Sequence, residues 1–263
     1  MRFVRIALFL LVAGLLATTA AASTFGDAIE AAKRGNLDRA IELYTQFIEQ
    51  SGRPDRDIAV AYNNRGVTYK RKGDLSRAIA DYSQAIRLRP NYAKAYYNRG
   101  NAYKDGRKPK MAIADYNRAI QIDPRMAAAY NNRGLCYRSL GQLDLAIADY
   151  NRAIELQPRV PRTYNNRGNA WKAKGQYQRA IADYNYALKL NPRYATPYYN
   201  RGVAYQKMGK LDLAIADIKR FMELNPRHPY GPRRLRLLQK LKAQQGGGKP
   251  APSDGGGRSG GKI

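Results

Sequence analysis

The sequence predicts an all-α protein, a solenoid of stacked helix hairpins. The strongest observation is a strict period of 34 residues, marked by a glycine that recurs at Gly66, Gly100, Gly134, Gly168 and Gly202. A proline closes each period, at Pro90, Pro124, Pro158, Pro192 and Pro226. Between these marks, apolar residues recur at steps of three and four, the spacing of one helical face. A fixed period of this length is typical of proteins whose repeats pack on their neighbours.

Each period divides into two helices, as the unit from Tyr130 to Pro158 illustrates. Its first helix places Tyr130, Gly134 and Tyr137 on one face, and Gly141 ends this helix just past the last turn. Its second helix carries apolar residues at the same spacing, namely Leu143, Ala146, Ile147, Tyr150, Ala153 and Ile154. Pro158 stops the second helix because proline lacks an N–H and clashes with the preceding turn. Small residues opposite large tyrosines indicate close packing of the two helices.

These marks resemble the tetratricopeptide repeat (TPR) family, which shares the period, the glycine, the following aromatic residue, the alanine, the second aromatic residue and the final proline. The resemblance implies a right-handed solenoid of stacked TPR helix-turn-helix repeats with a C-terminal capping helix. Five full repeats cover residues 59–228, and a degenerate first repeat with a linker covers residues 23–58. Four additional residues offset that first repeat, and we expect them in the linker around Arg53–Ile58.

The N-terminal segment resembles a secretory signal peptide. Arg2 and Arg5 precede the apolar run Ile6–Leu16, and the small residues Ala20–Ala22 follow it. The apolar run is about half the roughly 20 residues that span a bilayer as a helix. Residues 1–22 are therefore predicted as a signal peptide, with a membrane anchor as the alternative. We expect an exported chain that begins near Ser23 and is periplasmic or secreted.

The C-terminal segment is predicted to cap the solenoid. In residues 229–245, Leu235, Leu238 and Leu241 form an apolar face for the last repeat, and basic residues such as Arg233 and Lys240 face solvent. Residues 246–263 are glycine-rich with little apolar surface and are predicted to be a disordered tail. The net charge of the chain is +27, and removal of the two signal-peptide arginines leaves +25. Such an excess favours anionic partners.

The sequence contains no recognisable catalytic or metal-binding constellation. Cys136 is the only cysteine and takes a place that threonine or alanine holds in other repeats, so we interpret it as a packing residue. Trp171, the only tryptophan, takes a tyrosine position and is predicted to lie in the core. The only histidine, His228, lacks neighbouring cysteines or clustered carboxylates for a metal site. The prediction is a protein that is not an enzyme and has no cofactor.

An arginine before each glycine recurs together with an aspartate sixteen residues later. The pairs are Arg65–Asp81, Arg99–Asp115, Arg133–Asp149, Arg167–Asp183 and Arg201–Asp217. Because a guanidinium fork fits a carboxylate with two parallel hydrogen bonds, we interpret these pairs as a structural ladder between the two helices of each repeat.

An asparagine two residues before each glycine is the main binding candidate. The series is Asn64, Asn98, Asn132, Asn166 and Asn200. The family resemblance places the first helices on a concave surface, so these amides would line a groove, like the asparagine ladders of O-linked N-acetylglucosamine transferases. A side-chain amide both donates and accepts hydrogen bonds, so it can bind the N–H and C=O of a peptide unit whatever side chain that unit carries. The alternative is that the asparagines only bond to neighbouring helices.

Basic residues six positions after the asparagines are expected to edge the same groove. They are Lys70, Lys104, Arg138 and Lys172, with Gln206 in the fifth repeat. The alternative is that these charges are solvated and favoured by the helix dipole. Further inward candidates are Asn63, Tyr97, Asn131, Asn165 and Tyr199, together with Asn101 and Asn169.

Together these features predict a non-enzymatic protein–protein interaction scaffold of the cell envelope. Its groove would hold an extended segment of a protein or peptide partner, and the basic edge would suit an acidic one. The alternative is a basic envelope factor that binds nucleic acid or an anionic polymer through charge. Polymer binding through many phosphates would weaken steeply with salt, whereas amide-held peptide would not.

Overall fold

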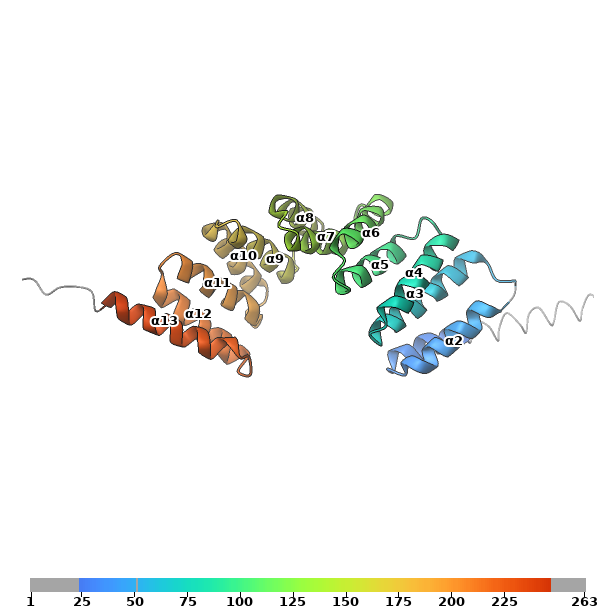
Figure 1. Ribbon diagram of the computed structural model, residues 1–263, viewed down its shortest axis with the longest axis horizontal. Coiled ribbons are helices and arrows are strands. Elements are labelled where there is room, and N and C mark those ends of the chain that lie inside the picture. Colours follow the sequence, from blue (N-terminus) through green and yellow to red (C-terminus); the bar gives the residue numbers. More distant parts are fainter. Residues whose placement is uncertain (1–23, 51, 247–263) are drawn as a thin grey trace, which may run out of the picture. The chain divides into compact units, whose positions relative to one another are not determined.

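The computed structural model describes residues 24–50 and 52–246, and these residues form helices without a β-strand (Figure 1). The predicted all-α repeat fold is thereby confirmed. The predicted signal peptide, residues 1–22, and nearly all of the predicted tail lie outside the described residues. In the part of the chain that the structure describes, every helix is too short or too polar to cross a membrane.

The helices separate into two compact units, one ending at Arg159 and the other beginning at Val160. The first unit contains a helix over residues 24–33, followed by α2 (Leu37–Glu49), α3 (Asp55–Arg71), α4 (Leu75–Leu88), α5 (Ala93–Asp105), α6 (Pro109–Ile122), α7 (Ala127–Ser139) and α8 (Leu143–Leu156). The second contains α9 (Pro161–Ala173), α10 (Tyr177–Leu190), α11 (Ala195–Lys207), α12 (Leu211–Leu224) and α13 (Tyr230–Gly246).

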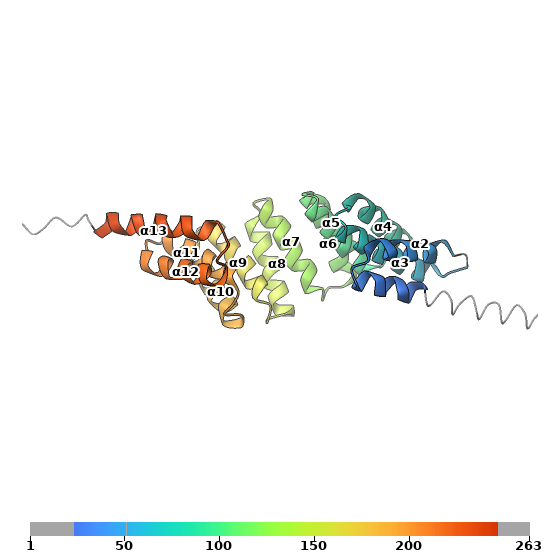
Figure 2. The ribbon, with the colours of Figure 1, turned by 90° about the horizontal axis from the view of Figure 1, so that it is seen from below.

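Helices pair within each repeat and stack in chain order within each unit. The pairs α3–α4, α5–α6 and α7–α8 make hairpins in the first unit, and α9–α10 and α11–α12 do so in the second. The second helix of one repeat then packs on the first helix of the next, as α4 does on α5 and α10 does on α11. Figure 2 shows this succession of helices in each unit.

The four additional residues before the first full repeat extend a helix instead of a linker. Helix α3 has 17 residues, whereas α5 has 13. Its added turn begins at Asp55, directly after Pro54. Proline before a helix is compatible with that start because its missing N–H is not needed there. The negative charges of Asp55 and Asp57 lie in the first turn, where they interact favourably with the positive end of the helix dipole. The prediction of a linker over Arg53–Ile58 was therefore wrong from Asp55 onward.

The turn inside each hairpin requires a left-handed backbone at one position. Gly141 takes φ 75° there, a conformation that costs glycine little. In the repeat before it, the equivalent residue is Arg107, with φ 57°. Among the described residues Arg107 is the only one other than glycine with a positive φ. The second repeat therefore carries backbone strain that the others avoid.

The repeated glycine marks a close helix crossing, as predicted. A Cβ added to Gly134 would stand 2.8 Å from Cε1 of Tyr150, whose side chain is completely buried. Gly66, Gly100 and Gly168 face a buried tyrosine at the same range. The glycine is thus required for the tyrosine ring of the second helix to lie against the first helix.

The predicted arginine–aspartate ladder is confirmed in all five repeats. In one of them, Arg99 Nε and Nη2 each donate to a different oxygen of Asp115, both at 2.8 Å. The guanidinium also donates from Nη1 to Ser83 Oγ of the preceding repeat at 2.9 Å. The four equivalent pairs, Arg65–Asp81, Arg133–Asp149, Arg167–Asp183 and Arg201–Asp217, have the same two-bond geometry. Each arginine–aspartate pair therefore joins the two helices of one repeat, and Arg99 also bonds its repeat to the preceding one.

Helix α13 closes the end of the second unit. Leu238 is completely buried in a cluster with Leu211 and Ile218, and Leu235 and Leu241 pack against that cluster. The apolar face predicted for the capping helix is therefore the one that packs. Its amphipathic pattern covers the last hairpin, as a solenoid end requires.

Candidate functional site

The predicted site residues lie on the first helices of successive repeats, which contact one another within each unit. In the first unit α3 contacts α5 and α5 contacts α7, and in the second α9 contacts α11. The surface that these helices share is called the first-helix face below, and it is considered separately in each unit.

In the first unit the asparagine ladder joins one repeat to the next. Asn98 Nδ2 donates to Asn63 Oδ1 at 2.8 Å, and Asn63 donates to its neighbour Asn64 at 3.2 Å. Asn132 Nδ2 lies 2.8 Å from Asn101 Oδ1 and 3.2 Å from the hydroxyl oxygen of Tyr97. The residues named as further inward candidates are thus the direct partners of the ladder.

The second unit repeats this arrangement with one basic residue included. Asn200 Nδ2 donates to Asn165 Oδ1 at 3.0 Å. Asn200 Oδ1 in turn accepts from Lys172 Nζ at 3.1 Å. Asn166 is placed on α9 and is buried, with 8% of its surface exposed. The second unit thus also carries a connected row of polar side chains on its first helices.

These bonds support the alternative interpretation that the asparagines tie neighbouring helices together. Asn132 and Asn200 are each only 8% exposed and make two or more hydrogen bonds within the protein. Asn64 and Asn98 are half-buried. One donor of Asn98 is used by Asn63, and its amide has a second N–H and a carbonyl. Asn64 and Asn98 are therefore the ladder residues best placed to contact a partner.

The basic residues of the predicted edge differ in their surroundings. Lys70 Nζ lies 2.7 Å from Asp105 Oδ2, and Lys104 Nζ lies 3.4 Å from Asp105 Oδ1. Partial burial would raise the pKa of Asp105, but Lys70 and Lys104 outweigh it and hold the pKa below its usual value. Arg138 is exposed, and Lys172 bonds to Asn200. The edge is therefore less positive near Asp105 than the sequence predicted.

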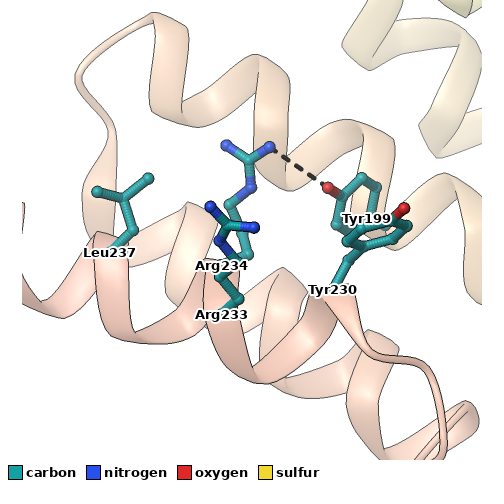
Figure 3. Close-up of a pocket in the computed structure, with 5 residues that line it drawn as sticks. All are labelled: Tyr199, Tyr230, Arg233, Arg234 and Leu237. Atoms are coloured by element: carbon teal, nitrogen blue, oxygen red, sulfur yellow. Dashed lines mark hydrogen bonds between the residues drawn. The ribbon is translucent and has the colours of Figure 1, made fainter.

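A groove beside the first-helix face of the second unit was not predicted. It has a volume of about 530 Å³ and is lined by Tyr199 of α11 and by Tyr230, Arg233, Arg234 and Leu237 of α13 (Figure 3). One residue of this α11–α13 groove, Arg234, belongs to the basic side of the capping helix, which was expected to face solvent. Arg234 is half-buried and donates to Gln206 Oε1 at 2.8 Å and to the Tyr199 hydroxyl at 3.3 Å.

The side chains that could carry chemistry lie apart or buried. Across residues 24–50 and 52–246, groups of three or more histidine, cysteine, aspartate or glutamate residues that could hold a metal are absent. Cys136 is 1% exposed, and burial raises the pKa of its thiol to about 11. A thiol in this state is a poor nucleophile near neutral pH, because only the thiolate reacts readily. The interpretation of Cys136 as a packing residue is confirmed. Trp171 is only partly buried, at the edge of a core cluster.

The repeats match known family models and known structures. Residues 66–106 and 168–209 match the model described as TPR repeat, and residues 93–126, 127–160 and 195–228 match the model described as Tetratricopeptide repeat. A tetratricopeptide repeat protein from Parabacteroides merdae is 22% identical, with a TM-score of 0.68 over 88% of this chain and 95% of that one. YrrB, a TPR protein with an unusual peptide-binding site, is 24% identical, with a TM-score of 0.60 over 76% and 97%. MamA is 26% identical, with a TM-score of 0.58 over 64% and 92%.

The family models together span more than half of the chain, and their borders follow the 34-residue period. The helix hairpins that the structure describes fall in the same register. The chain belongs to the tetratricopeptide repeat family.

Proposed function

We propose that this protein is a non-enzymatic scaffold that holds an extended segment of a partner protein against its first-helix face. The proposal is supported by the family, whose members typically bind protein or peptide partners, and by the similarity to YrrB, which has a peptide-binding site. The observation that carries it is the row of amide and basic side chains that continues from repeat to repeat within each unit. Such a row matches the repeating C=O and N–H groups of an extended chain.

The predicted site residues are proposed to differ in role: some contact the partner and others hold the first helices together. Asn64, Asn98 and Lys104 are half-buried, and Arg138 is exposed, so their polar groups can be reached. Asn132, Asn166 and Asn200 are assigned mainly to holding the face together, and Lys172 helps to position Asn200. Lys70 and Lys104, on either side of Asp105, would orient the segment and not simply attract negative charge.

Single substitutions on the face test the binding proposal. The chain from Ser23 onward is used to isolate a partner from envelope extract, and the affinity for that purified partner is then measured. Loss of one amide pair is worth about 0.5–1.5 kcal/mol, so Asn98→Ala is expected to weaken binding roughly two- to tenfold. Lys104→Gln is expected to weaken it as well, whereas Lys110→Gln removes the same charge from the exposed surface of α6 and is expected to leave affinity unchanged. Equal affinities for wild type, Asn98→Ala and Lys104→Gln would reject the first-helix face.

We also propose that the protein is exported and acts in the cell envelope. The support is the signal-like sequence, with Arg2 and Arg5 before a short apolar run and Ala20–Ala22 after it. The test is the intact mass of the native protein together with its cell fraction. A chain that begins near Ser23 in the periplasm or medium is the expected result. A full-length chain in the cytosol contradicts export, and a full-length chain in the membrane shows an anchor.

A further inference from the structure

The α11–α13 groove has the position of a site at the end of the first-helix face in the second unit. Arg234 follows Asn200 by one period of 34 residues, so it takes the place where the asparagine ladder would continue. Its contact with the Tyr199 hydroxyl corresponds to the contact of Asn132 with the Tyr97 hydroxyl in the first unit. The capping helix thus places a guanidinium where the earlier repeats place an amide.

The surroundings of this guanidinium differ from those of the arginines in the structural ladder. Each arginine of that ladder forms an ion pair with a buried aspartate, namely Arg65, Arg99, Arg133, Arg167 and Arg201. Arg234 is held instead by two neutral groups, Gln206 Oε1 and the Tyr199 hydroxyl, and lies 5.7 Å from the centre of the Tyr199 ring. Within the described part of the chain, Arg234 makes no ion pair. A guanidinium carries five N–H donors, so these contacts leave donors for a ligand.

A second arginine and two apolar side chains complete the groove. Arg233 is exposed, and the lining residues include no carboxylate that could neutralise it. Figure 3 shows the two guanidinium groups between Leu237 on one side and the tyrosines on the other. Tyr230 is 58% exposed and Leu237 is 44% exposed. Large apolar surface is therefore available on both sides of a concentrated positive charge.

We propose that the α11–α13 groove binds a carboxylate of the partner segment that is flanked by an apolar or aromatic side chain. Arg234 is already oriented by Gln206 and Tyr199, so it pays little entropy to accept a carboxylate, and Arg233 supplies a second charged donor. Tyr230 and Leu237 contact the flanking side chain. This inference rests on the proposed scaffold function, and it assigns to the capping helix a preference for acidic segments.

The test measures peptide binding by fluorescence anisotropy with the chain from Ser23 onward. The probes are labelled octapeptides with one aspartate or glutamate beside leucine or phenylalanine and with an amidated carboxyl terminus, compared with the same peptides carrying asparagine or glutamine. The acidic peptides are expected to bind the wild type about tenfold more tightly, as is typical when a hydrogen bond involves a charged group. Neutral peptides with a free carboxyl terminus form a third arm. Tight binding in that arm would identify the chain end as the source of the carboxylate.

Arg233→Gln is the decisive variant because Arg233 is exposed and makes no hydrogen bond or ion pair within residues 24–50 and 52–246, so its replacement is expected to leave the fold intact. Arg236→Gln is its control. Both remove one charge from α13, but Arg236 does not line the groove. Arg233→Gln is expected to reduce the preference for a carboxylate several-fold, because only Arg234 remains to bind it, and Arg236→Gln is expected to keep the full preference. Equal weakening by both variants, or equal affinity of acidic and neutral peptides for the wild type, overturns the proposal. If the isolated partner still needs Asn98 and Lys104 in that case, the groove fails and the scaffold function stands.

Discussion

The contact between Gly134 and Tyr150 predicts a cost for adding a single methyl group. In Gly134→Ala, the new Cβ would lie 2.8 Å from Cε1 and 3.1 Å from Cδ1 and Cζ of Tyr150. Tyr150 is completely buried, so its ring has little room to shift away from the added methyl. Overpacking typically costs about 1–3 kcal/mol, and alanine returns about 1 kcal/mol through its higher helix propensity. The expected net loss is therefore up to about 2 kcal/mol, and more for Gly134→Leu.

A natural control is present in the fifth repeat, where isoleucine replaces the tyrosine. A Cβ on Gly202 would meet Ile218 Cδ1 at 3.2 Å, and the Ala214 carbonyl oxygen and Asp217 Cβ at 3.3 Å, contacts that a shift of a few tenths of an ångström relieves. The melting temperature of Gly134→Ala, followed by circular dichroism, is expected to lie about 2–6 °C below that of Gly202→Ala. Combining Gly134→Ala with Tyr150→Ile should cost less than the sum of the two changes, because the added methyl then faces an isoleucine, as it does in Gly202→Ala. A Gly134→Ala variant that melts at or above Gly202→Ala would refute the assigned packing face.

Three further substitutions or reagents test the structure elsewhere. Arg99→Ala leaves the carboxylate of Asp115 buried without its partner and is expected to lower the free energy of unfolding in urea by about 3–5 kcal/mol. Adding Asp115→Leu to Arg99→Ala should recover most of that loss. A double variant no more stable than the single one would contradict this. Arg107→Gly removes the strain of a left-handed backbone and is expected to raise the free energy of unfolding by about 0.5–1 kcal/mol. A decrease would show that the contacts of the Arg107 side chain contribute more than the backbone strain costs. The Cys136 thiol, whose pKa burial raises to about 11, is expected to react with a disulfide reagent at pH 8 only after denaturation, and rapid reaction of the native protein would contradict its burial.

The fold and its internal ladder could be predicted because they depend on residues at constant offsets. Gly134 meets Tyr150 sixteen residues later, and Arg133 meets Asp149 at the same distance in sequence. The same offsets recur in the other repeats, except that isoleucine replaces the tyrosine in the fifth. A contact that recurs in this way is recognisable from spacing alone. The positions of the asparagines on the first helices were predictable for the same reason.

The features that occur once could not be read from the period. Asp105 lies between Lys70 and Lys104, but other repeats have no acidic residue at its place. Arg234 continues the register of the ladder with a different side chain, and its partners become visible only when α13 is docked on α11. The hydrogen bonds of the asparagines also depend on the neighbouring repeat, because Asn98 finds an amide at Asn63 where Asn132 finds Tyr97 and Asn101.

Site-specific photo-crosslinking tests the central claim, that a partner segment lies on the first-helix face. A photoreactive amino acid is placed at Lys104 of α5 in one variant and at Met111 of α6, which is 47% exposed, in another. Both variants are expressed in the native host and irradiated in living cells. The account predicts a defined crosslinked protein from position 104 and none from position 111. The same crosslink from both positions, or from position 111 alone, would contradict it.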